Sequence, residues 1–103
     1  MTFSNQKQET NRQPDELSYF IQKTESYLDQ VVGHGNDQEL FIASYLQGHF
    51  AVAAGLSQVK QMTRIKQLAG LMFTSFTLAF DNDELADEDQ KQVLALWETL
   101  LTK

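Results

Sequence analysis

Apolar residues in this chain recur at steps of three and four from Leu17 to Leu101, a spacing that places side chains on one face of an α-helix. Polar interruptions divide the pattern into four segments, and none of them alternates as a β-strand would. One proline and five glycines occur in 103 residues, so the chain has few helix-breaking positions. The pattern predicts an all-α protein with four helices.

The first predicted helix opens at Pro14, whose fixed backbone angle suits a first turn. Gly33-His34-Gly35 is expected to end it, with a glycine in the left-handed conformation. Asn36 then begins a second helix, and Glu39 completes a capping box with it. The apolar face of the first helix consists of Leu17, Phe20, Ile21, Thr24, Tyr27, Leu28 and Val31.

The second predicted helix has an unusually wide apolar arc, which favours a central position with several neighbours. This arc consists of Phe41, Ile42, Tyr45, Leu46, Phe50, Val52, Ala53 and Leu56. Residues 58–63 are polar but contain no proline or glycine, so a turn and a continuous helix both remain open. A third helix is predicted from about Arg64 to Phe80. A fourth has acidic residues 87–89 in its first turn and Trp97 in its core stripe.

The connections between these helices are short, which makes sequential helices antiparallel neighbours. We therefore expect an antiparallel four-helix bundle over residues 14–103. Residues 1–13 are rich in Gln, Asn and Thr, and Phe3 is their only large apolar residue. Such a segment buries too little surface to offset its ordering entropy, so it is predicted to be a flexible N-terminal tail.

Acidic residues outnumber basic ones by 14 to 8, and residues 81–103 alone hold seven acids against two bases. A chain of this sign repels phosphate backbones and anionic membranes, so we expect neither nucleic acid nor a membrane as a partner. No apolar run approaches the length that a membrane span needs, and the N-terminus lacks the apolar core of a secretory signal. These features predict a cytoplasmic protein.

No motif for a metal, a cofactor or a catalytic group is found. The chain has no cysteine, no Gly-x-Ser-x-Gly and no Glu-x-x-His pair of the di-iron bundles. The acidic stretch from Asp81 resembles a calcium loop, but Leu85, Ala86 and Gln92 stand where that loop needs an oxygen ligand, glycine and glutamate. We therefore expect a solvated loop, with no metal, no cofactor and no catalytic residue.

Small residues line one side of the second helix: Ser44, Gly48, Ala51 and Gly55. Glycine inside a helix costs about 1 kcal/mol relative to alanine, so two of them indicate the close approach of another helix. That helix belongs either to the same chain or to a partner, with Leu71 and Leu78 of the third helix beside the contact. The strip favours a protein–protein interaction module without catalytic activity, as a homodimer or with another protein.

His49 lies in the middle of the apolar arc of the second helix. A buried imidazole needs hydrogen-bond partners, so a structural histidine bonded to a hydroxyl or a backbone carbonyl is one interpretation. The alternative is a small-ligand-binding or catalytic protein with a pocket around His49, in which Tyr27 or Tyr45 supplies a hydroxyl. A cavity that reaches His49 distinguishes the second interpretation from the first. A third hypothesis is that the acidic residues at 81–89 mimic nucleic acid. The acidic patch is small for that purpose, which counts against this hypothesis.

Two stretches of the chain resemble a known family. Residues 36–50, NDQELFIASYLQGHF, carry DxELF, YL and GH elements, and residues 84–101, ELADEDQKQVLALWETLL, carry EL, DQ and WE. Together they resemble the YfcL-like family of small bacterial proteins over residues 15–101. The resemblance implies a bacterial, cytoplasmic, helical protein and no particular activity or site residue. Where its relatives have Ser-Pro before the last helix, this chain has Ala86-Asp87, and Asp87 is expected to be the cap.

Overall fold

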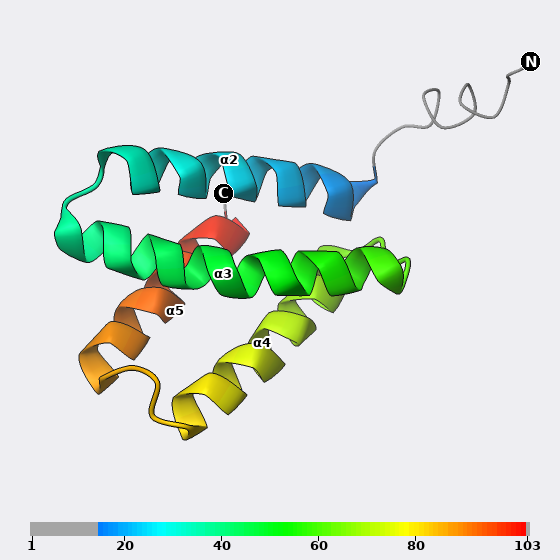
Figure 1. The fold of residues 1–103 in the computed structure, drawn as a ribbon. Coiled ribbons are helices and arrows are strands. Elements are labelled where there is room, and N and C mark those ends of the chain that lie inside the picture. The colour runs from blue at the N-terminus through cyan, green and yellow to red at the C-terminus, as the bar shows by residue number, and fades with distance from the viewer. Residues whose placement is uncertain (1–14, 103) are drawn as a thin grey trace, which may run out of the picture.

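The computed structural model describes residues 15–102, which form four helices joined by short loops (Figure 1). They are α2 (Glu16–His34), α3 (Asp37–Val59), α4 (Ile65–Asp81) and α5 (Asp87–Thr102). No strand occurs within these residues, so the all-α prediction is confirmed. The predicted tail of residues 1–13 lies outside the described residues.

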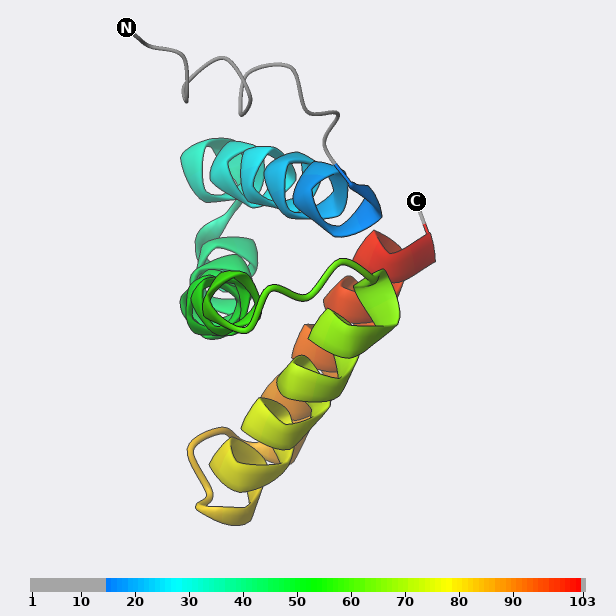
Figure 2. The ribbon, with the colours of Figure 1, turned by 90° about the vertical axis from the view of Figure 1, so that its right-hand side faces the viewer.

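The helices form a bundle of two antiparallel hairpins. α2 and α3 run side by side in opposite directions, and the pair formed by α4 and α5 crosses them obliquely (Figure 1, Figure 2). α3 contacts each of the other three helices, and α2 also contacts α4. The central position predicted for the second helix is therefore confirmed.

Polar side chains cap the starts of two helices. Asn36 and Glu39 form the predicted capping box, in which each side chain accepts a hydrogen bond from the backbone N–H of the other at 2.8–2.9 Å. The Asp15 carboxylate accepts from the N–H of Ser18 at 2.8 Å and caps α2. The expected Asp87 cap is wrong: Asp87 is the first residue of α5.

The end of α2 differs from the prediction of a left-handed glycine. Gly35 has a φ of −78° and no glycine in the described residues has a positive φ. The reason for glycine at this position is space. A Cβ on Gly35 would lie 2.8 Å from the carbonyl oxygen of Val31 and 2.9 Å from the Cβ of Glu39. Glycine lets α3 begin directly against the last turn of α2.

A turn at residues 60–64 separates α3 from α4, which settles the question that the sequence left open. Gln61 takes the left-handed conformation with a φ of 58°, and the N–H of Met62 donates to the carbonyl of Ser57 at 2.9 Å. This is the Schellman pattern, which usually has a glycine in the left-handed position. α4 ends in the same way, with Asp83 at a φ of 57°.

The core contains the apolar stripes of all four helices. Its centre is an aromatic cluster of Phe20, Phe50 and Trp97, whose ring centroids lie 6.0–6.3 Å apart. Edge-to-face contacts at such distances add to the burial energy of the rings. The prediction that Trp97 belongs to the core is confirmed. The buried apolar residues of α2 and α3 are Leu17, Phe20, Ile21, Leu28, Ile42, Ala43, Leu46, Phe50, Ala53 and Ala54.

One part of the wide apolar arc of α3 is not in the core. Phe41, Val52 and Leu56 are exposed, because α2, α4 and α5 cover the other sides of the helix. By length and composition alone, α3 is long and apolar enough to cross a membrane. The expectation that no segment of the chain is long and apolar enough is therefore wrong for α3. A core helix passes the same test, and α3 is the helix that contacts all the others.

Candidate functional site

The most unusual surface of the molecule is the uncovered side of α3, which we call the outer face of α3. Three of its apolar side chains are largely exposed: Phe41 at 46%, Val52 at 64% and Val59 at 81%. An exposed apolar patch of contiguous residues often marks a protein–protein contact. The outer face consists of Phe41, Ser44, Gly48, Ala51, Val52, Gly55, Leu56 and Val59.

The four small residues of the predicted strip all lie on this outer face. No atom lies within 4 Å of the position that a Cβ would take on Gly48 or Gly55, and Ser44 and Ala51 are exposed. Within residues 15–102, no other helix packs closely over Gly48 or Gly55. The other three helices bind α3 on the sides that carry the larger buried residues.

The two leucines expected beside the strip differ from each other. Leu78 is 61% exposed, whereas Leu71 is half-buried and packs against the core. Both lie about one turn from Ser75, which contacts His49 of α3, so they follow the side of α4 that is turned toward α3. Leu78 is therefore open to solvent on α4, and Leu71 mainly stabilises the fold.

The outer face is also free of charge. From Leu40 to Val59 the sequence contains no Asp, Glu, Lys or Arg, although the whole chain has a net charge of −6. Acidic residues lie at the start of α3, where the negative charges of Asp37 and Glu39 interact favourably with the positive end of the helix dipole. Lys60 follows the last residue of the helix. The neutral surface thus has an acidic end and a basic end.

His49 is half-buried between α3 and α4 rather than fully buried as its position in the apolar arc suggested. Its Nδ1 atom lies 2.5 Å from the Oγ atom of Ser75. The ring centroid lies 4.6 Å from that of Tyr45 and 5.8 Å from that of Phe76. The hydroxyl beside the imidazole is therefore that of Ser75, while Tyr45 contributes its ring.

Tyr45 extends this cluster to the loop between α4 and α5. Its hydroxyl donates a hydrogen bond to the Oε1 atom of Glu84 at 3.0 Å. Burial, together with the hydrogen bond and the charge of Glu84, raises the pKa of Tyr45 to about 12. The phenol therefore stays protonated at neutral pH, and the contact joins α3 to the loop that starts α5.

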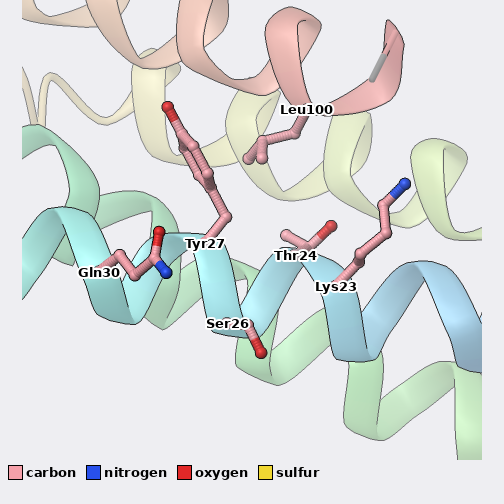
Figure 3. A pocket seen from close by; sticks show the side chains of 6 residues that line it. All are labelled: Lys23, Thr24, Ser26, Tyr27, Gln30 and Leu100. Carbon is pink, nitrogen blue, oxygen red and sulfur yellow. The ribbon is translucent and has the colours of Figure 1, made fainter.

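Four hollows in the surface of residues 15–102 lie away from His49. The largest of four, about 450 Å³, is lined by Tyr27 and its neighbours on α2 and by Leu100 of α5. In Figure 3 the Tyr27 and Lys23 side chains point toward α5 on either side of Thr24, and Ser26 points away. None of these four hollows has His49 in its lining. Within residues 15–102, no three His, Asp or Glu side chains are grouped so that they could hold a metal ion.

Comparison with known proteins identifies the family. The family model described as YfcL protein matches residues 18–102. The chain belongs to the YfcL family. The uncharacterized protein YfcL of Escherichia coli strain K12 is 27% identical over 84 residues, which cover 82% of this chain and 91% of that protein. No solved structure matches the chain.

Membership of the YfcL family confirms the resemblance and assigns no site residue. Sequence reasoning missed the partners Ser75 and Glu84, because both lie far from α3 along the chain. It also missed Val59 as the most exposed apolar residue. The spacing of Val59 from Val52, seven residues, places both on the side opposite the core stripe and could have indicated it.

Proposed function

We propose that this YfcL-family protein is a small protein–protein interaction module of the cytoplasm without catalytic activity, and that the outer face of α3 is its binding surface. The observation that carries the proposal is the combination of exposed Phe41, Val52 and Val59 with open Gly48 and Gly55 on one uncharged helix face. Burying such side chains on a partner is favourable by about 25 cal/mol for each Å² of apolar surface.

The glycines support the same proposal. Each costs α3 about 1 kcal/mol of helix stability relative to alanine, and no side chain of residues 15–102 packs against either of them. Small residues at these positions allow a partner to lie close against the helix backbone. The alternative of a pocket around His49 lacks a corresponding support, because the four hollows lie elsewhere.

Site-specific photocrosslinking in the native host cell tests the proposal. A photoreactive amino acid in place of Val52 is expected to form an adduct with a protein. The same amino acid in place of Tyr19 of α2 is the control, since Tyr19 is 61% exposed and Val52 is 64% exposed. Adducts at Val52 and none at Tyr19 support the binding surface. No adduct at Val52, or equal yields at both positions, contradicts it.

A further inference from the structure

Four residues on the outer face of α3 have a spacing that is the same in both directions along the helix. Phe41, Gly48, Val52 and Val59 are separated by seven, four and seven residues, which brings all four to one side of the helix. We infer that the partner of this surface is a second copy of the chain, bound with its α3 antiparallel, with a two-fold axis at the level of residue 50. This inference rests on the binding surface proposed above.

The sizes of the side chains complement each other only in the antiparallel orientation. Around an axis at residue 50, Gly48 of one copy faces Val52 of the other, and Phe41 faces Val59. Val52 is 64% exposed and no atom occupies the space over Gly48, so the valine has room to insert. In a parallel pair each residue would meet its own copy, and two Gly48 residues would leave a gap.

Charge favours the same orientation. The first turn of α3 carries Asp37 and Glu39, and the residues after its last turn include Lys60 and Arg64. The antiparallel pair brings the acidic end of each α3 next to the basic end of the other, and it also opposes the two helix dipoles favourably. A parallel pair would place like charges together. The uncharged stretch between the ends lets two chains of net charge −6 meet without repulsion at the contact.

Cysteine crosslinking tests the orientation, because the natural chain contains no cysteine. Phe41→Cys and Val59→Cys are prepared as separate variants, one with a mass tag, and are oxidised alone and as a mixture. In the antiparallel dimer each cysteine lies about 27 Å along the helix from its own copy, too far for a disulfide, which needs Cα atoms within about 7 Å. We expect a disulfide-linked dimer when the mixture is oxidised. We expect no such dimer when either variant is oxidised alone. Crosslinking of each variant with itself overturns the antiparallel orientation.

Sedimentation of the unmodified chain tests the second copy itself. We expect a dimer whose dissociation constant rises at least tenfold in Val52→Glu, because the carboxylate would be buried at the contact. Phe73→Glu on α4 is the control: Phe73 is 72% exposed and lies outside the outer face, so this variant is expected to keep the dimer. A monomer at all concentrations overturns the inference. If the photocrosslink at Val52 then contains a different protein, the proposed binding surface stands while the second copy does not.

Discussion

Tyr45 is the residue whose ionisation gives the clearest prediction. Its pKa is raised to about 12 in the folded chain, from an ordinary value near 10, first by burial and then by Glu84. A raised pKa means that the fold favours the protonated phenol. The resulting stability is fully present below pH 10 and is lost as the pH rises from 10 to 12.

Unfolding by urea at pH 9 and at pH 11 measures this loss. The parent is expected to lose more stability between the two values than Tyr45→Phe, which has no phenol to ionise. Tyr45→Phe is also expected to cost about 1 kcal/mol at pH 9, because it leaves Glu84 without its hydrogen bond. Tyr19→Phe, at an exposed position, is the control and should follow the parent. Equal pH dependence of parent and Tyr45→Phe would show that the contact does not favour the neutral phenol.

Two glycines at the end of α2 form a matched pair. Gly35→Ala places a methyl group 2.8 Å from the Val31 carbonyl oxygen, so it is expected to destabilise the fold by about 1–3 kcal/mol. Gly33→Ala meets no atom within 4 Å and lies inside the helix, so it is expected to stabilise by up to about 1 kcal/mol. Thermal unfolding of the two variants should shift in opposite directions. Shifts of the same sign would count against the close approach of α3 to α2.

At the scale of the helices, the sequence predicts most of the fold. The repeat of apolar residues identifies all four helices, and the Asn36–Glu39 box gives the start of α3. The end of α3 was harder to predict, because the left-handed position that stops the helix holds Gln61, where glycine is usual. The outer face is partly predictable, because the sequence shows its small residues. Which sides of α3 are covered by α2, α4 and α5 depends on tertiary packing, and the helix pattern does not specify it.

Gln61 therefore gives a prediction for the turn. Gln61→Gly is expected to stabilise the protein by about 1 kcal/mol, because a left-handed backbone is unfavourable for residues with a Cβ atom. Lys60→Gly is the control: Lys60 has a φ of −87°, so glycine there brings no relief and adds entropy to the unfolded chain. Urea unfolding compares the two variants. Equal or lower stability of Gln61→Gly would show that the Gln61 side chain has contacts that outweigh the backbone term.

At the scale of the whole molecule, the two hairpins are joined where α2 and α4 begin. The N–H of Leu17 donates to the carbonyl of Thr63 at 3.3 Å, and the Glu16 carboxylate accepts from the N–H of Ile65 at 2.8 Å. The crossing of the hairpins brings Glu16 and Ile65 together from positions 49 apart in the chain. Helix periodicity specifies which face of α2 is buried, but not where along α4 it meets its neighbour, so this junction could not be predicted.

Glu16 is the side chain that holds this junction, since it caps a helix of the other hairpin. Two helix N-termini with positive dipole ends meet there, and the carboxylate lies between them. Glu16→Ala is expected to cost about 1 kcal/mol, the usual loss for a helix cap, and Glu16→Gln is expected to cost less because an amide oxygen can still accept the Ile65 N–H.

Glu25→Ala, at an exposed position of the same helix, is the control and should change the stability by less than about 0.5 kcal/mol. Urea unfolding orders the three variants, and hydrogen exchange of the Ile65 amide should quicken in Glu16→Ala alone. If Glu16→Ala and Glu25→Ala are equally stable and the Ile65 amide exchanges at the parent rate in both, the hairpins are held by their apolar core without this cap.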